Sequence, residues 1–277
     1  MDRIFLSIYL ENLFCVLAFM AVVWVLSLKL KDASIADIFW GLGFVLVAWI
    51  TFLRADGFLG RKLLVAGIIT LWGLRLAIHI ATRNLGKGED PRYQAWRAQH
   101  GKRFWWISLF KVFFLQGVLL WVIALGGQAA MHSVFPGTLV WQDVLGTVIC
   151  MIGLVFEAMA DWQLRRFKAK PGSRGKVMDQ GLWAYSRHPN YFGESLIWWG
   201  LFLIAMADVK NVWTLVSPVL ITFLLLRVSG VSLLERHIKK RRPQYDAYMA
   251  RTSAFIPWFP KKRDDHRQRQ GGDHGQQ

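Results

Sequence analysis

Cysteine is scarce in this sequence of 277 residues, which contains only Cys15 and Cys150. Both cysteines lie inside long apolar runs, so neither a disulfide framework nor a zinc site is expected. Charged residues are also scarce: they make up 19% of the chain, whereas a typical soluble domain carries about 25%. The stretch "GLGF" at 41–44 lies inside an apolar run and lacks the strand–turn–helix context of a dinucleotide fingerprint. These shortages disfavour an ordinary soluble domain.

Long apolar runs separate the charged clusters, and 54% of the residues are hydrophobic. Runs of roughly 18 to 25 residues can cross a hydrocarbon core of about 30 Å. The sequence therefore predicts an all-α polytopic membrane bundle of about seven transmembrane helices. Residues 1–260 are expected to form a single integral-membrane domain, and 261–277 a disordered, basic and polar tail. The first run is expected to be a retained helix rather than a signal peptide. The predicted spans are 4–28, 36–53, 63–82, 107–126, 140–162, 192–208 and 211–234.

Basic residues outnumber acidic ones by 34 to 18, which gives a net charge of +16. They gather in the segments 83–106 and 163–191 and after residue 234, whereas 127–139 contains no lysine or arginine. The positive-inside rule then places the C-terminus in the cytoplasm and the N-terminus outside, with the basic segment 54–62 as an exception. This pattern indicates an integral membrane protein that contacts lipid, rather than one that binds nucleic acid.

Ionisable residues inside the predicted spans are candidates for functional sites. Asp37 lies about one turn into the span 36–53, where it either complements the helix dipole behind an N-cap at Ser34 or faces an internal cavity. In "LWGLRLAIHIATRN", Arg75, His79 and Arg83 are spaced four residues apart and form one polar stripe on a helix. Such a stripe is expected to face the bundle interior, where it can hold an anion or a substrate oxygen.

A second stripe lies near the end of the span 140–162, in "FEAMADWQLRRFKAKPG". Glu157, Asp161 and Arg165 are spaced four residues apart, and Lys168 follows. Carboxylates accept hydrogen bonds from ribose hydroxyls and cations bind phosphates, so this order suits a nucleotide. The alternative is a set of surface salt bridges, worth only about 0–1 kcal/mol each.

The stretch "GLWAYSRHPNYFGE" places polar residues at the start of the next apolar helix. Pro189 is acceptable in a first turn, and Asn190 and Glu194 then lie on one helix face. An amide and a carboxylate together match a carboxamide such as that of nicotinamide. Arg187 and His188 stay at the interface, where a ligand phosphate or carboxylate would lie. The alternative is an interfacial anchor with a helix cap.

These motifs resemble the steroid 5-alpha reductase family, and most closely its bacterial members of unassigned function, over a C-terminal region of about 140–260. The resemblance implies the bacterial inner membrane as the location. The resemblance rests on "EAMADWQLRRFKAKPG", "GLWAYSRHPNYFGE" and the tail up to "FIPW", which fall in the family's order. It implies a seven-helix membrane enzyme that binds NADPH from the cytoplasmic side. The "RHPNY" motif alone is also similar to isoprenylcysteine carboxyl methyltransferases, which bind S-adenosylmethionine.

The resemblance also implies roles for individual residues. Asn190 and Glu194 are expected on the nicotinamide side, and Asp161, Arg165 and Lys168 on the adenine–ribose–phosphate side. Glu157 stands where the family has an asparagine. The remaining residues expected to bind the cofactor are Arg187, His188, Tyr191, Arg227, Arg236, His237 and Tyr248.

The N-terminal half departs from the family pattern, in which a glutamate and a tyrosine surround an enone carbonyl. Asp37 replaces the glutamate, and Trp72, which cannot protonate an oxygen, stands at the tyrosine's position. Tyr93 or His79 is then the expected donor. Together these features predict hydride transfer from NADPH to a conjugated double bond in a lipophilic substrate. The alternatives are an S-adenosylmethionine-dependent methyltransferase and a non-catalytic lipid-binding membrane protein.

Overall fold

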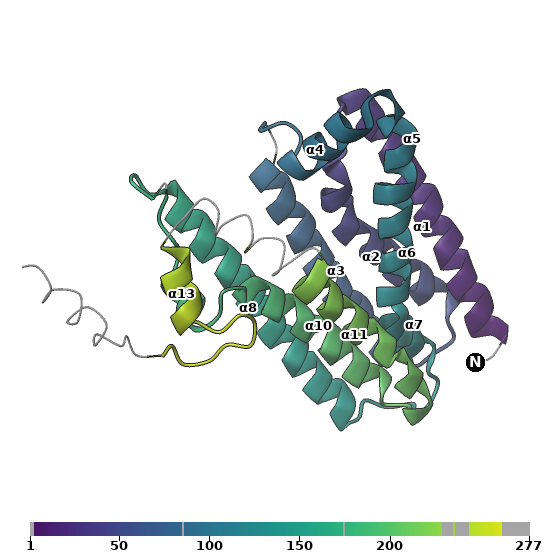
Figure 1. Ribbon diagram of the computed structural model, residues 1–277. Helices are drawn as coiled ribbons and strands as arrows, with labels where there is room; N and C mark the ends of the chain where they lie inside the picture. The colour runs from purple at the N-terminus through teal and green to yellow at the C-terminus, as the bar shows by residue number, and fades with distance from the viewer. Residues whose placement is uncertain (1–2, 85, 174, 229–234, 236–243, 262–277) are drawn as a thin grey trace, which may run out of the picture. The chain divides into compact units, whose positions relative to one another are not determined.

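The computed structural model describes residues 3–84, 86–173, 175–228, 235 and 244–261. These residues form helices and no strand, apart from an isolated bridge between Ser186 and Ser253 (Figure 1). The predicted all-α membrane fold is therefore confirmed. Helices are expected in such apolar segments because they satisfy every backbone hydrogen-bonding group internally.

Six helical stretches are long and apolar enough to cross a membrane, rather than the seven predicted, among the residues that the structure describes. The predicted span 192–208, which is not among these six, corresponds to helix α10 (Pro189–Ala205). Its 17 residues extend only about 25 Å at 1.5 Å per residue. The direction in which the chain enters the membrane stays a prediction. The six stretches are Arg3–Leu30, Ile35–Arg54, Leu59–Asn84, Pro91–Ile123, Trp141–Ala169 and Val209–Val228.

The chain divides into two compact units. Unit 1 comprises Met1–Met151 and Leu196–Ile221, and unit 2 comprises Ile152–Ser195 and Thr222–Gln277. The prediction of a single domain over 1–260 stays a prediction. Residues 262–277 of the expected disordered tail lie outside the described part of the chain.

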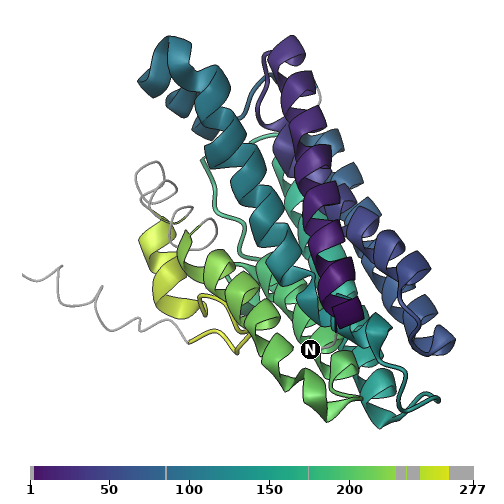
Figure 2. The ribbon, with the colours of Figure 1, turned by 90° about the vertical axis from the view of Figure 1, so that its right-hand side faces the viewer.

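Unit 1 contains the N-terminal helices, whose tightest contact joins α2 to α3 (Figure 1). A Cβ atom added at Gly41 would lie 2.5 Å from the Gly73 carbonyl oxygen, so glycine at this crossing allows the two backbones to touch. Helix α1 runs along α2 and α6 (Figure 2). The elements of this part are α1 (Arg3–Leu30), α2 (Ile35–Arg54), α3 (Leu59–Asn84), α4 (Pro91–His100), α5 (Phe104–Ser108), α6 (Leu115–Ile123) and α7 (Leu125–His132).

A short 3-10 turn, η1 (Gly101–Arg103), and a π-helix, η2 (Leu109–Phe114), interrupt the helical run from α4 to α6. The 3-10 helix η3 (Val209–Leu215) and most of α11 (Val216–Phe223) also belong to unit 1. Its core holds three aromatic rings, of Phe44, Trp72 and Trp198, with centroids 4.6 to 5.3 Å apart. Trp72 is 1% exposed, so this side chain is part of the aromatic core.

A buried ion pair joins the start of α3 to the start of α8 (Trp141–Ala169), both within unit 1. Arg61 donates to the two oxygens of Asp143 at 2.7 and 3.0 Å, and the two side chains are 0% and 1% exposed. The same guanidinium donates to the carbonyl oxygens of Pro136 and Thr138. The ion pair therefore anchors the connection between α7 and α8.

Unit 2 contains the second half of α8, the first residues of α10, the short helix α9 (Leu182–Tyr185), the π-helix η4 (Leu224–Val228) and α13 (Tyr245–Arg251). Here α8 and α10 approach closely at Gly193, where an added Cβ would lie 2.6 Å from the Glu157 nitrogen and from the Gly153 carbonyl oxygen. A side chain at this position would separate the helices that carry the predicted cofactor residues.

Candidate functional site

A hydrogen-bonded pair of a phenol and a carboxylate lies in unit 1. Tyr93 donates its hydroxyl to Asp37 Oδ1 at 2.7 Å, and the tyrosine is 4% exposed. Arg92 donates from Nη2 to Asp37 Oδ2 at 2.8 Å, which gives the carboxylate a cationic partner. The structure thus brings together two of the three residues predicted for catalysis. The hydroxyl beside Asp37 belongs to Tyr93.

Gln116, in α6, completes this cluster. Its amide nitrogen donates to the Tyr93 hydroxyl at 3.2 Å and to Asp37 Oδ1 at 3.4 Å. Its amide oxygen is buried and has no hydrogen-bond partner within the described ranges of the chain. Buried polar atoms are almost always hydrogen-bonded in folded proteins. The Gln116 amide oxygen can therefore accept a further hydrogen bond.

The first turn of α4 positions Tyr93. Asp90 accepts a hydrogen bond from the Arg92 N–H at 2.9 Å and so caps the helix, and Pro91 occupies its first position. Tyr93 therefore follows the helix start by one half-turn, where Asp37 is its neighbour. Without this cap, the Arg92 N–H would lose its acceptor.

Glu89 ties the same turn to the start of α2. One carboxylate oxygen accepts from the Ala33 N–H at 2.8 Å, and both accept from Arg97 at 2.8 and 2.9 Å. Burial would raise the pKa of Glu89, but the hydrogen bonds from Arg97 and Ala33 outweigh it and hold the pKa below its ordinary value. Glu89 is therefore ionised at neutral pH and fastens the segment that carries Tyr93.

Arg75 and His79, the third predicted catalytic residue, lie on α3 and are half-buried, as the stripe pattern requires. The His79 carbonyl accepts from Thr82 at 3.0 Å. Arg83, one turn further on, donates to Asn84 at 3.1 Å at the exposed end of the helix. The predicted role of His79 as a donor to substrate stays a prediction.

A second polar cluster lies in the interior of unit 1. Asn12 donates to Thr51 Oγ1 at 2.9 Å and to Gln128 Oε1 at 2.7 Å. Both amide side chains are at most 2% exposed. Sequence reasoning missed this cluster because single amides in apolar runs carry no charge.

In unit 2 the predicted carboxylates of α8 and α10 are buried. Glu157, Asp161 and Glu194 are 3%, 8% and 9% exposed. Asn190 donates its amide to Asp161 Oδ1 at 3.2 Å, so the structure joins the two predicted stripes at this point. The burial of Glu157 excludes its interpretation as a surface salt-bridge residue. A group of buried carboxylates instead offers acceptors to hydroxyl or amide donors.

The predicted phosphate partners Arg165 and Lys168 are exposed on α8. A cavity of about 190 Å³ opens on another face of the same helix. Arg166 lies over the Trp162 ring, with 5.3 Å from the guanidinium carbon to the ring centroid. This cavity is lined by Trp162, Gln163, Arg166, Phe167, Lys170, Met178, Gln180 and Gly181. Sequence reasoning missed it, although Trp162, Arg166 and Lys170 have the four-residue spacing of a helix face.

Arg187, predicted to meet a phosphate, has partners within unit 2. It donates to both oxygens of Glu235, at 2.7 and 3.3 Å, and to the carbonyl oxygens of Met249 and Thr252. His188 Nε2 lies 3.2 Å from Glu235 Oε1. Burial would raise the pKa of Glu235, but His188 and Arg187 hold it below its ordinary value. These contacts attach the C-terminal segment to Arg187 and His188.

The remaining predicted residues lie in different surroundings. Tyr191 stacks on His188, with ring centroids 5.6 Å apart. Tyr248 donates its hydroxyl to the Trp183 carbonyl, and burial raises its pKa, so the hydroxyl stays a donor. Arg227 is exposed at the end of η4. Arg236 and His237 lie outside the described residues.

A comparison with family models identifies a family without stating an activity. The model described as "Protein of unknown function (DUF1295)" matches residues 23–252, which include Asp37, Tyr93 and Gln116 and the buried carboxylates of unit 2, but not Asn12. The chain is 27% identical over 282 aligned residues to Uncharacterized protein C594.04c of Schizosaccharomyces pombe, and the alignment covers 85% of this chain and 76% of the relative. No solved structure matches the chain.

Proposed function

The chain belongs to the DUF1295 family, and we propose that it is a membrane-embedded, NADPH-dependent reductase. Its substrate is a lipophilic molecule of steroid, isoprenoid or lipid type, with a carbon–carbon double bond conjugated to a carbonyl. The observation that carries the proposal is the hydrogen bond that the buried Tyr93 donates to Asp37. Donors held in apolar surroundings stabilise a carbonyl oxygen as it gains negative charge. The resemblance to steroid 5-alpha reductases supports the same reaction class.

In unit 1, Tyr93 is the donor to the substrate carbonyl. Its hydroxyl hydrogen turns from Asp37 to the carbonyl oxygen, and Arg92 keeps the Asp37 carboxylate in place. Gln116 stabilises the reoriented hydroxyl and has an amide oxygen to offer to a ligand donor. The kind of membrane stays a prediction: the expected one is bacterial and inner, and the relative is fungal.

In unit 2, the buried acceptors fit the polar groups of NADPH. Glu157 and Asp161 are suited to ribose hydroxyls, and Asn190 with Glu194 to a carboxamide. The cofactor supplies the hydride when it is bound. The cavity of about 190 Å³ is smaller than the roughly 300–1,000 Å³ of ligand pockets. It therefore holds one part of a dinucleotide, and Arg166 and Lys170 suit a phosphate there.

One observation favours a second candidate, an S-adenosylmethionine-dependent methyltransferase. The donors of Arg187 are engaged by Glu235 and by two backbone carbonyls, so this arginine is already neutralised within the chain. S-adenosylmethionine contains ribose hydroxyls but no phosphate. It would use the buried carboxylates of α8 and would need no cation for a phosphate.

Cofactor binding to the detergent-purified protein tests the proposal. Wild type and Asn190→Ala/Glu194→Ala are titrated with NADPH and with S-adenosylmethionine by isothermal calorimetry. Glu11→Ala, which removes a half-exposed carboxylate in unit 1, is the matched control. We expect saturable NADPH binding in wild type and control, and its loss in the double variant.

Charge variants on the two faces of α8 refine the same experiment. Arg166→Gln/Lys170→Gln changes the cavity, and Arg165→Gln/Lys168→Gln changes the exposed stripe. If the phosphate lies in the cavity, only the first pair weakens NADPH binding. Binding of S-adenosylmethionine alone would establish the methyltransferase class, and binding of neither cofactor would leave a lipid-binding membrane protein.

A further inference from the structure

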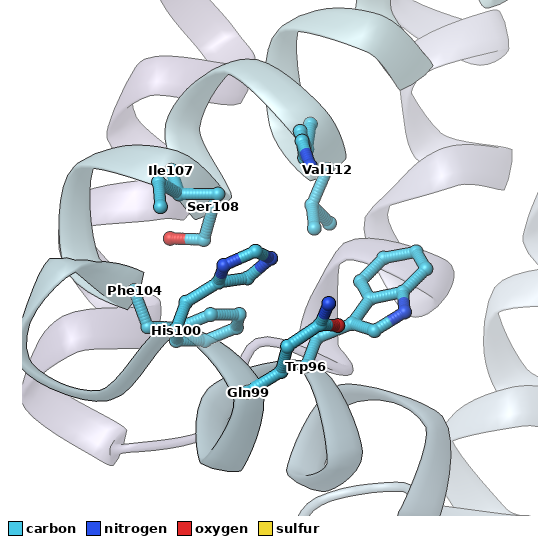
Figure 3. Close-up of a pocket in the computed structure, with 8 residues that line it drawn as sticks. Trp96, Gln99, His100, Phe104, Ile107, Ser108 and Val112 are labelled. Atoms are coloured by element: carbon cyan, nitrogen blue, oxygen red, sulfur yellow. The ribbon is translucent and has the colours of Figure 1, made fainter.

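Unit 1 contains a cavity of about 180 Å³ whose lining includes neither Tyr93 nor Asp37. This cavity has no role in the proposed reduction. Figure 3 shows the His100 ring at its centre, with Trp96 and Gln99 on one side and Ser108 on the other. The remaining lining residues are Phe104, Ile107, Lys111 and Val112. Trp96, Phe104, Ile107 and Val112 form the apolar part of the wall, and Gln99, His100, Ser108 and Lys111 supply its polar groups.

The backbone builds this cavity at two irregular points. Helix α4 ends at His100, and Gly101 has a φ of +52°, a conformation that favours glycine. The chain then turns through η1 into α5, so that α4 and α5 contribute to one cavity. Lys111 and Val112 come from the π-helix η2, a form that is rare and often found at functional sites.

The electrostatics of the cavity favour an anion. Its lining includes Lys111 and His100 and no carboxylate. The segment 96–111 contains four lysines and arginines and no acidic residue. Arg97 is bound by Glu89 and lies 4.5 Å from the centroid of the Phe104 ring, so it supports the wall. Lys111 is exposed and can reach a ligand at the cavity mouth.

The surroundings favour a lipid as the source of the anion. Trp105, Trp106 and Phe110 belong to the same segment and are 55%, 44% and 57% exposed. Tryptophan is enriched at the level of the lipid headgroups. Basic pockets between transmembrane helices on the cytoplasmic side bind anionic headgroups, and the sequence predicts that this segment faces the cytoplasm. A soluble anion would make no favourable contact with the adjoining apolar surface.

We propose that the cavity formed by α4, α5 and η2 binds the phosphate headgroup of an anionic phospholipid. The phosphate oxygens accept from Lys111 Nζ, the His100 ring and the Gln99 amide. The acyl chains lie against the exposed aromatic side chains of α5 and η2. The proposal does not depend on the reductase function, because none of these residues belongs to the Tyr93–Asp37 pair or to unit 2.

Native mass spectrometry of the delipidated full chain tests the proposal, with dihexanoyl phosphatidylglycerol and dihexanoyl phosphatidylcholine as probes. Removing one lysine–phosphate contact, worth about 1 kcal/mol, corresponds to about a fivefold loss of affinity. We expect that loss for phosphatidylglycerol in Lys111→Gln, and less than a twofold change in Lys102→Gln, whose exposed cation does not line the cavity. Phosphatidylcholine should bind more weakly than phosphatidylglycerol to wild type.

Ile107→Trp fills the cavity without changing its charge, and we expect it to abolish phosphatidylglycerol binding. Circular dichroism checks that each variant retains its helices. Equal losses in Lys111→Gln and Lys102→Gln would overturn the proposal, because diffuse surface attraction would then suffice. Displacement of the lipid by millimolar inorganic phosphate would also overturn it and identify a soluble-anion site.

Discussion

The Tyr93–Asp37 hydrogen bond allows separate predictions for the stability and for the activity of one variant, Tyr93→Phe. Tyr93→Phe removes one hydroxyl from a site that is 4% exposed and leaves the ring in place. The lost bond is 2.7 Å long and has a carboxylate as its acceptor, a class worth about 1.5–3 kcal/mol. Asp37 keeps the hydrogen bond from Arg92, so its negative charge still has a cationic partner. We expect a loss of unfolding free energy within that range.

A double-mutant cycle measures this interaction. Tyr93→Phe, Asp37→Asn and the double variant are unfolded in detergent with increasing dodecyl sulfate, and tryptophan fluorescence reports the transition. We expect a coupling energy of at least about 1 kcal/mol, since contacting residues couple by roughly 0.5–3 kcal/mol. Tyr185→Phe, at an exposed tyrosine of unit 2, should change the stability by less than about 0.5 kcal/mol.

The activity of the same variant tests the proposed role. Loss of one donor to a developing oxyanion lowers kcat by about 10²–10³. We expect Tyr93→Phe to show that loss in NADPH oxidation with an enone-bearing lipid, while NADPH binding in unit 2 is unchanged. Wild-type turnover by Tyr93→Phe, or a coupling energy near zero, would refute the reasoning that the pair is a stable unit with a catalytic donor.

Three further predictions concern stability. Gly41→Ala should lower the unfolding free energy by about 1–3 kcal/mol through overpacking. Gly67→Ala should not, because a Cβ atom at Gly67 would have no neighbour within 4 Å. Equal effects of the two substitutions would contradict this prediction. Asp143→Leu strands the buried Arg61 and should cost about 3–5 kcal/mol, while Arg61→Met/Asp143→Leu should cost far less in the same unfolding assay. The pKa of Glu235 is held below its ordinary value of 4.5, so its stabilisation is full above that pH and is lost as the pH falls below it. The protection factors of the α13 amides against hydrogen exchange should therefore fall below pH 4.5 in wild type, and Glu235→Gln should remove this pH dependence.

Several features of the candidate site were predictable from residue spacing. The four-residue intervals of Glu157, Asp161, Asn190 and Glu194 placed each pair on one helix face, and the structure buries all three carboxylates and joins Asp161 to Asn190. Tyr93 was expected beside Asp37 only if its segment folded over the helices. The cap at Asp90 starts the helix that carries Tyr93, and "EDP" is the sequence signal for this helix start.

Other features had no usable signal in the sequence. Gln116 is a single amide in an apolar run, and Arg187 finds Glu235 across 48 residues. The four-residue rule holds within one helix and cannot foresee which distant segment supplies a partner. The predicted phosphate role of Arg187 arose from the motif alone, without its competing carboxylate.

The sequence by itself determined the membrane helices of this protein, because apolar length and backbone hydrogen bonding leave no other fold for such runs. It also determined which polar residues share a helix face. Only the tertiary structure decided which faces meet. The contact at Gly41 and the Tyr93–Asp37 pair both depend on the approach of segments that are distant along the chain. Close packing decides which segments approach one another. Many small contacts contribute to that packing, and no single residue pattern in the sequence predicts it.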